Sequence, residues 1–286
     1  MVTNTIDGPL GSWRQSSCRP ARLTGFVEGV WLFDGVLTNR RERTFPNGLF
    51  EIFVHLGDRY RLVEDAGVSC DQLCPSTCVT GLQLGHLVVE APASRTTVLG
   101  IRLTPAGAYA IFGRPMHEIT RLTVDAADLL GTAADELSDT CGAALAISHE
   151  ACLGAAVRWI EARRGLGVRL DPAIEWMGGE IRRREGAAPI AELRERTGWS
   201  KSRLASTFLH QVGVTPKQLA RVLRFNHALR RLHGDPTPLS ELAAECGYYD
   251  QPHMTGEFRE LSGMTPAAFI RAIRYPLSIN VAEQSS

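Results

Sequence analysis

The feature that most constrains the fold of this 286-residue chain is a pattern that occurs twice in its last third. Each copy has a glycine, two apolar residues four positions apart, a second glycine and a proline. The two sets are Gly198, Leu204, Phe208, Gly213 and Pro216, and then Gly247, Met254, Phe258, Gly263 and Pro266. Glycine readily adopts the left-handed backbone of a tight turn or a helix end. Each copy is therefore predicted to be a helix-turn-helix closed by a second glycine.

Capping residues place the ends of the predicted helices. Ser200 and Asp250 are expected to cap the second helix of each copy, because their side chains can accept hydrogen bonds from free N–H groups at a helix start. Thr237 is expected to cap the first helix of the second copy, with Pro238 as its first residue. Between the copies, residues 217–232 are expected to form one helix roughly 25 Å long. Such a rod would hold the two units at a fixed separation.

The outward face at the start of each second helix is expected to reach DNA. Polar side chains on a helix in the major groove can contact base edges, and basic ones contact phosphates. The candidates in and just after the first copy are Lys201, Ser202, Arg203, Ala205, Ser206 and Lys217. Those in the second copy are Gln251, His253, Thr255 and Gly256. The alternative for each of these residues is a solvated surface position.

The charge distribution favours a local contact with DNA. The chain has 31 Lys and Arg against 31 Asp and Glu, which argues against a surface that binds polyanions everywhere. Residues 169–275 nevertheless hold 16 Lys and Arg against 12 Asp and Glu, whereas the remainder holds 15 against 19. The basic excess lies in the segment with the repeat, as local phosphate binding requires.

Residues 26–113 have the pattern of short strands. Polar and apolar residues alternate in residues 50–55, and Gly57-Asp58 offers a two-residue hairpin turn into a strand at Tyr60. Residues 82–89 and 98–103 are further strand candidates. This spacing predicts a small antiparallel barrel or sandwich with room for a ligand. The candidates to line an effector pocket are Trp31, Phe50, Glu51, Phe53 and Tyr60, with plain core packing as the alternative for the aromatic residues.

A helical period replaces the strand pattern in residues 124–164 and predicts two helices with a break near residues 138–142. These helices could form a dimer interface or pack against the barrel of their own chain. Residues 165–172 are the best linker candidate. The predicted organisation is therefore α+β: an antiparallel β-barrel in residues 1–123, a helical connector in residues 124–168 and an all-α tandem helix-turn-helix domain in residues 169–286.

The second copy resembles a known family. The runs ECGYYDQPHM at residues 245–254, Phe258-Arg259 and GMTP at residues 263–266 are similar to the signature of the AraC/XylS family of bacterial transcription regulators. This resemblance covers residues 171–275. The N-terminal part resembles the cupin-like domain of a subgroup of that family, through TFPNGLFEI at residues 44–52, GLQ at residues 81–83 and GIRLTPAGAY at residues 100–109.

The resemblance implies a function and partners. In the family, the N-terminal barrel binds a small effector or mediates dimerisation, and the C-terminal domain binds promoter DNA. We therefore expect a DNA-binding regulator without enzymatic activity or a cofactor. Its expected partners are double-stranded promoter DNA, a small-molecule effector, RNA polymerase if it is an activator, and a second copy in a homodimer. Many relatives carry arginines where this chain has Ser206 and Gly256, and Ser202 stands where a large or basic residue is frequent, so arginine contacts to guanine are expected to be missing.

The expected cellular location rests on three features that the sequence lacks. The N-terminus has no apolar core of a signal peptide, and no 18-residue uncharged apolar run occurs. Seven scattered cysteines do not resemble a secreted disulfide framework. The protein is expected to be cytoplasmic, without a membrane partner and with reduced thiols.

Two other functions remain as alternatives: a thiol- or metal-responsive regulator and a metalloenzyme fused to a DNA-binding domain. Cys70, Cys74 and Cys78 could bind a soft metal or form a regulatory disulfide, which would make the chain a thiol- or metal-responsive regulator, although incidental thiols are the simpler interpretation. A cupin-type metalloenzyme fused to a DNA-binding domain would need convergent His and carboxylate ligands. The histidines of the first half, His55, His86, His117 and His149, are far apart in the sequence. His55 is expected to be a satisfied core residue.

Overall fold

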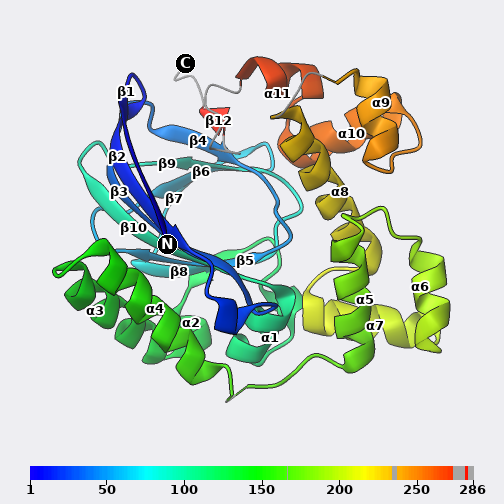
Figure 1. The fold of residues 1–286 in the computed structure, drawn as a ribbon, viewed down its shortest axis with the longest axis horizontal. Helices are drawn as coiled ribbons and strands as arrows, with labels where there is room; N and C mark the ends of the chain where they lie inside the picture. The colour runs from blue at the N-terminus through cyan, green and yellow to red at the C-terminus, as the bar shows by residue number, and fades with distance from the viewer. Residues whose placement is uncertain (166, 234–236, 273–280, 283–286) are drawn as a thin grey trace.

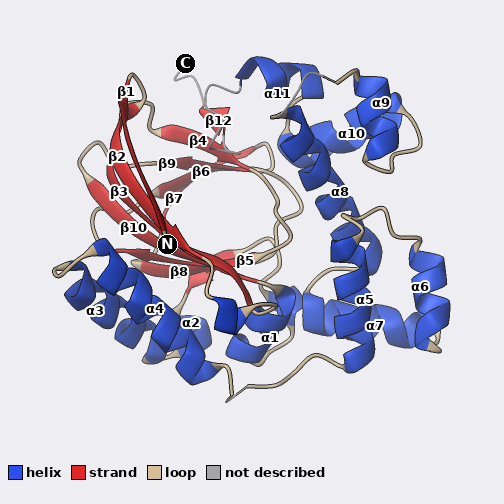
Figure 2. Cartoon of the chain, viewed as in Figure 1, coloured by secondary structure: helices blue, strands red, loops and turns tan. Residues whose placement is uncertain are grey.

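The computed structural model describes residues 1–165, 167–233, 237–272 and 281–282. Two antiparallel sheets form the N-terminal part, and helices form the C-terminal part (Figure 1). Coloured by secondary structure, the strands gather on one side of the molecule and the helices border them below and beside (Figure 2). This arrangement confirms the predicted fold class of an antiparallel β part followed by an all-α part. The strands belong to two separate sheets, so closure into a single barrel stays a prediction.

The larger sheet has the strand order β1-β2-β3-β10-β5-β8-β11. Its strands are β1 (Val2–Gly8), β2 (Gly11–Cys18), β3 (Val27–Leu37), β10 (Thr96–Leu103), β5 (Phe50–His55), β8 (Thr77–Thr80) and β11 (Thr123–Asp125). The predicted strands at residues 50–55 and 98–103 are confirmed as β5 and β10. The hairpin of the edge strand β1 with β2 was not predicted, because both strands are rich in polar residues and lack an apolar alternation.

The smaller sheet has the order β12-β4-β9-β6-β7. Its strands are β12 (Val281–Ala282), β4 (Arg41–Thr44), β9 (Leu87–Glu90), β6 (Arg61–Asp65) and β7 (Val68–Leu73). The hairpin predicted at Gly57-Asp58 is wrong. Strand β5 already pairs with β10 and β8 on its two edges, so the chain leaves it and crosses to the smaller sheet, where β6 pairs with β9 and β7.

The strand predicted at residues 82–89 is also wrong in its first half. Only β9 is a strand there, and residues 81–86 connect the two sheets. Leu82 is fully buried in this connection, so its apolar character reflects core packing and not strand pairing.

Short helices and an antiparallel helix pair lie along the larger sheet (Figure 1). They are η1 (Ala21–Leu23), α1 (Pro105–Phe112), η2 (Met116–Glu118), α2 (Ala127–Leu130), α3 (Ala133–Leu145) and α4 (His149–Arg163). The break predicted near residues 138–142 is wrong, because α3 continues through Gly142. The break falls at residues 146–148, where the Ser148 side chain caps α4 by accepting from the Ala151 N–H. Leu137, Cys141 and Leu153 are buried, so these helices pack against their own chain.

Seven helices make up the described C-terminal region. They are α5 (Pro172–Arg183), α6 (Ile190–Thr197), α7 (Lys201–Val212), α8 (Pro216–Leu232), α9 (Leu239–Glu245), α10 (Gln251–Ser262) and α11 (Pro266–Ala272). The predicted caps at Ser200 and Asp250 are confirmed, since their side chains accept from the N–H groups of Arg203 and His253 at 3.3 and 2.7 Å. Helix α9 begins one residue later than predicted, with Pro238 in place of Thr237 at its cap position.

The apolar core is continuous between the β part and the first helix-turn-helix unit. One cluster joins Phe50 and Ile101 of the larger sheet to Met177 of α5 and Phe208 of α7. A second cluster places Phe45, which follows β4, between Phe225 of α8 and Phe269 of α11, with ring centroids 6.1 and 5.8 Å from that of Phe45. The helical region is therefore packed onto the β part at both of its units.

The second helix of each unit ends on the β part. The Thr120 hydroxyl donates to the carbonyl of Gly213, which caps α7, at 2.8 Å. The Arg43 guanidinium of β4 donates to the carbonyl of Ser262, the last residue of α10, at 3.0 Å. A cation near the C-terminal end of a helix is electrostatically favourable. The repeat thus meets the β part at two structurally equivalent points.

Replacing Gly263 by alanine should test the contact at the end of α10. Gly263 and Gly198 have similar left-handed backbones, with φ of 75° and 68°. A Cβ at Gly198 meets open space, whereas a Cβ at Gly263 meets Arg43 and His86. Gly198→Ala is expected to lower the free energy of unfolding by about 1–2 kcal/mol from backbone strain alone. Gly263→Ala should lower it clearly further in denaturant titrations of the full chain, and equal losses would contradict the contact.

Candidate nucleic-acid interface and ligand cavity

The structure separates the outward and inward faces of α7 as the repeat predicts. Leu204 and Phe208 are buried. The predicted DNA-contacting residues of this helix, Lys201, Ser202, Arg203, Ala205 and Ser206, are all exposed, as is Lys217 at the start of α8. The guanidinium of Arg203 lies over the Trp199 ring, 3.9 Å from its centroid, and this stacking holds the arginine at the beginning of the helix.

Helix α10 presents a different set of groups. Gln251, His253 and Gly256 are exposed and Thr255 is half-buried, while Met254 and Phe258 are buried beneath them. The His253 ring turns back toward its own helix start. Its Nδ1 accepts from the Tyr249 N–H at 3.3 Å, and its Nε2 lies 3.4 Å from the Glu257 carboxylate. A base contact by His253 would have to replace these interactions, whereas the Gln251 side chain makes no such interaction within the part of the chain that the structure describes.

The residues predicted to shape the motif have the expected geometry. Gly198, Gly213, Gly247 and Gly263 all have positive φ between 68° and 89°. Pro216 and Pro266 are buried first residues of α8 and α11. The Glu257 carboxylate of α10 pairs with the guanidinium groups of Arg221 and Arg224 on α8, at 3.4 and 3.0 Å. These ion pairs fix the second unit to the helix that joins the two units.

Sequence reasoning missed one residue at this surface. Tyr249, directly before the Asp250 cap, is 92% exposed and therefore stands beside the predicted contacts of α10. A tyrosine hydroxyl is a suitable donor to a phosphate. The sequence offered one indication that Tyr249 is exposed, namely its position directly before the capping residue Asp250. That indication was ambiguous, because the adjacent Tyr248 is also a tyrosine and is buried.

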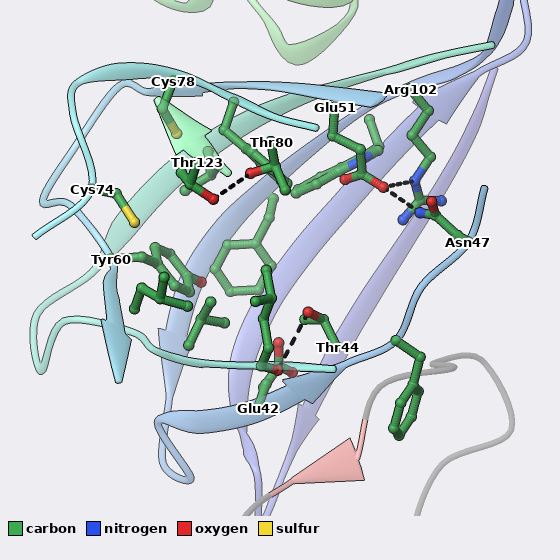
Figure 3. A pocket seen from close by; sticks show the side chains of 18 of the residues that line it. Glu42, Thr44, Asn47, Glu51, Tyr60, Cys74, Cys78, Thr80, Arg102 and Thr123 are labelled. Carbon is green, nitrogen blue, oxygen red and sulfur yellow. Dashed lines mark hydrogen bonds and ion pairs between the residues drawn. The ribbon is translucent and has the colours of Figure 1, made fainter. Parts of the chain in front are cut away.

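A cavity of about 330 Å³ lies between the two sheets (Figure 3). Strands β2, β3, β5 and β10 supply one wall, and β4, β6 and β9 supply the other. Four of the five predicted effector residues line it: Trp31, Glu51, Phe53 and Tyr60. Phe50 does not. Side chains alternate along β5, so Phe50 points with Ile52 into the core beneath the helices, whereas Glu51 and Phe53 face the cavity.

A polar cluster stands at the edge of the cavity nearest the helical region. The Glu51 carboxylate accepts from the Asn47 amide at 2.6 Å and from the Arg102 guanidinium at 3.3 Å (Figure 3). Arg102 also lies over the Trp31 ring, 5.9 Å from its centroid. Neither Asn47 nor Arg102 was among the predicted effector residues, because only the fold brings the segment after β4 beside β10.

His55 is the buried, satisfied core residue that the sequence predicts, and it also lines the cavity. Its Nδ1 lies 3.1 Å from the Pro75 carbonyl and 3.3 Å from the Ser76 carbonyl, so Nδ1 carries the proton and donates. Burial lowers the pKa of His55, since a charged ring is poorly solvated there. His55 is therefore neutral near pH 7, and its Nε2 is an acceptor.

The three cysteines do not form one site. Cys70 is exposed on β7 and its thiol faces the Leu62 carbonyl, whereas Cys74 and Cys78 are buried and line the cavity. The thiols of Cys74 and Cys78 are hydrogen-bonded to each other, which lowers the pKa of Cys74 and raises that of Cys78. Within the described residues, no three His, Cys, Asp or Glu side chains gather in a way that could hold a metal ion.

Comparison with known proteins finds matches to two separate parts of the chain. Residues 193–272 match a family of helix-turn-helix domains, and residues 18–125 match a domain family of unknown function (DUF6597). The HTH-type transcriptional regulator Rv1931c of Mycobacterium tuberculosis is 29% identical over 126 residues, which are 42% of this chain and 48% of that protein. The transcriptional activator RhaR of Salmonella arizonae is 34% identical over 64 residues, 22% of this chain and 23% of that protein.

These matches confirm the family resemblance. The C-terminal region has a helix-turn-helix domain of the AraC type, similar to those of transcription regulators. The matched segments span less than half the length of either curated regulator. The solved structure of ToxT from Vibrio cholerae aligns with 81% of this chain and 96% of its own, with a TM-score of 0.45 and 10% identity. No helix in the described ranges is long and apolar enough to span a membrane.

The neutral state of His55 predicts a pH-dependent stability. Because burial lowers its pKa in the folded chain, the unfolded chain binds the proton first, near its ordinary pKa of about 6.5. The contribution of His55 is therefore complete above about pH 6.5 and is lost as the pH falls. His55→Asn keeps a donor at the Nδ1 position without a titratable ring. Its free energy of unfolding should fall less than that of wild type between about pH 7.5 and pH 5.5.

The exposed His117 provides the control for this measurement. His117→Asn should leave the pH dependence of the free energy of unfolding close to that of wild type. A pH profile of His55→Asn that parallels wild type would mean that His55 has the same pKa in the folded and unfolded chains, which would contradict the lowered pKa.

Proposed function

We propose that this protein is a transcription regulator that binds double-stranded promoter DNA with α7 and α10, under the control of a small molecule held in the cavity. The observation that carries this proposal is a single segment, residues 41–49, that belongs both to the cavity wall and to the support of the DNA-binding helices.

Strand β4 contacts both the cavity and the helical region, because successive side chains along a strand point to opposite faces. Glu42 and Thr44 point into the cavity (Figure 3). Arg41 and Arg43 point the other way: Arg41 pairs with Glu90, and Arg43 donates to the last carbonyl of α10. A ligand that binds at Glu42 and displaces β4 would therefore also move Arg43, which bonds to the end of α10.

The loop after β4 makes the corresponding contact with α8. Phe45, Pro46, Asn47 and Leu49 line the cavity. The Asn226 amide of α8 donates to the Pro46 carbonyl at 2.6 Å, and the Arg182 guanidinium of α5 donates to the Gly48 carbonyl at 3.2 Å. A ligand can change DNA binding only if it favours one arrangement of these contacts over another. The loop after β4 contacts both the cavity and α8, so a bound ligand could favour one position of α8 over another in this way.

The remaining parts of the proposal follow from the resemblance to the AraC family. A regulator of this kind acts in the cytoplasm without an enzymatic reaction, and an activator would also contact RNA polymerase. Packing of α3 and α4 against their own sheet buries their apolar faces, so a homodimer would use another surface.

Binding-site selection with the full chain and random duplex DNA tests the DNA-binding role. Gln251→Ala should weaken binding to the selected site by ~1–3 kcal/mol and relax the sequence preference at one or two base pairs, because a base-edge contact is lost. Lys217→Ala should instead weaken binding to all sequences and reduce the log–log salt slope by about 0.9, because one phosphate contact is lost.

Arg14 provides a matched control, since it is an exposed cation on β2, away from the helical region. Arg14→Ala should change neither the selected sequence nor the salt slope. Selection of no sequence by the wild type, or unchanged motifs and slopes in both variants, would contradict the proposed interface.

A specific observation supports a second candidate input. Cys74 and Cys78 are adjacent thiols inside the cavity wall, and Cys74 has the lowered pKa that favours the reactive thiolate. Hydrogen peroxide could oxidise them: one S–S bond forms, the O–O bond breaks, and the two thiol protons and two electrons leave in two molecules of water. The chain would then be a thiol-responsive regulator that uses two of the three predicted cysteines.

Peroxide treatment of the full chain tests this input. The expected product has lost two hydrogens by intact mass, retains fewer free thiols and binds the selected DNA site differently. Cys74→Ser with Cys78→Ser should abolish the change in DNA binding. The matched control is Cys141→Ser with Cys152→Ser, which removes a second hydrogen-bonded thiol pair, buried between α3 and α4. An unchanged response in the first variant would refute the Cys74–Cys78 input.

A further inference from the structure

The charged groups of the cavity are unequal in number and differ in position. Two carboxylates, Glu42 and Glu51, and one guanidinium, Arg102, line it, together with the neutral imidazole of His55. We propose that the cavity binds an organic cation, a small amine with an aromatic body, whose ammonium group lies at Glu42. This inference deepens the proposed function by giving the chemical class of the effector.

Arg102 is poorly placed to receive an anionic ligand. Its guanidinium already bonds to Glu51, and its side chain is 41% exposed, whereas that of Glu51 is 13% exposed. A ligand carboxylate that captured Arg102 would leave Glu51, a mostly desolvated carboxylate, without its cation. Such a loss is costly in a poorly solvated site. The Asn47–Glu51–Arg102 cluster is therefore a closed polar group at the cavity edge.

Glu42 places a second carboxylate in the cavity, on the wall formed by the smaller sheet. Its carboxylate and the Tyr60 phenol both point into the cavity space (Figure 3). The proximity of this negative charge adds to the effect of burial in raising the pKa of Tyr60, so the phenol is neutral. A carboxylate has about four acceptor sites, so Glu42 can receive an ammonium N–H in addition to its present interactions. His55 lines the cavity from β5, on the wall opposite β4, and its ring lies beside that of Tyr60, with ring centroids 5.9 Å apart.

The aromatic walls suit the rest of such a ligand. Trp31 and Phe53 meet edge to face with ring centroids 6.0 Å apart, and Trp13 and Phe33 lie 6.2 Å apart. Aromatic faces attract ammonium groups and also stack on an aromatic body. A volume of about 330 Å³ accommodates a ligand of this size. A carboxylate, a neutral imidazole acceptor and several aromatic faces together favour an ammonium over a carboxylate of the same skeleton.

Calorimetry on the full chain with three matched probes tests the inference. The probes are 2-phenylethylamine, 2-phenylethanol and 3-phenylpropionate, which differ mainly in the charge of the polar end. The amine should bind about tenfold tighter than the alcohol, and the carboxylate should bind weakest. Glu42→Gln should remove the preference for the amine while leaving the affinity for the alcohol within about twofold. Glu150→Gln, at an exposed position on α4, should change neither affinity.

Two results would overturn the inference. The first is tighter binding of 3-phenylpropionate than of the amine, with that affinity lost in Arg102→Gln. The second is no measurable heat with the amine at millimolar concentration. Either result leaves the DNA-binding role standing, because that role is tested by Gln251→Ala and Lys217→Ala. Amine binding that depends on Glu42 but does not alter affinity for the selected DNA site would support the ligand class and contradict control of DNA binding by the cavity.

Discussion

The arrangement of this molecule depends on the docking of residues 45–49 onto α8. Asn226, 7% exposed in the middle of that helix, donates to the Pro46 carbonyl at 2.6 Å and to the Val222 carbonyl at 2.9 Å. Buried polar groups are stable only when they are hydrogen-bonded, so this side chain fixes the position of the loop. Phe45 adds apolar contact with Phe225 beside it. Because α8 carries a helix-turn-helix unit at each end, this short loop contributes to the position of both units relative to the sheets.

The same loop connects the cavity to the helices that are proposed to bind DNA. Residues that line the cavity have neighbours that bond to α5, α8 and α10, so the cavity and the frame of these helices share a wall. Tightly packed interiors change between discrete arrangements and do not deform freely. The ends of α7 and α10 are both held by the β part, through Thr120 and Arg43. Control of the two helices together is therefore physically reasonable for this fold.

The C-terminal region was predictable because its signals are local. Glycines with positive φ, serine and aspartate caps, and apolar residues at helical spacing act within a few residues of one another. Ser200, Asp250 and the four turn glycines accordingly have the predicted roles. Local sequence patterns gave wrong predictions where a strand pairs with strands that are far away in the sequence. Gly57-Asp58 resembled a hairpin turn, yet the edges of β5 are occupied by β10 and β8. Phe50 resembled a cavity residue, yet its place on β5 directs it into the core.

The sequence by itself determined the tandem helix-turn-helix, the long helix between its units and a β part with aromatic residues suited to a cavity. These features depend on periodicity, capping and backbone freedom, which act over short distances. The tertiary structure alone decided which side chains face the cavity, that Arg102 and Asn47 bond to Glu51, and that Cys74 and Cys78 separate from Cys70. It also decided that Arg43 meets Ser262 across 219 positions of the chain. Such contacts depend on how two sheets and a helical region pack, and no local pattern in the sequence encodes that packing.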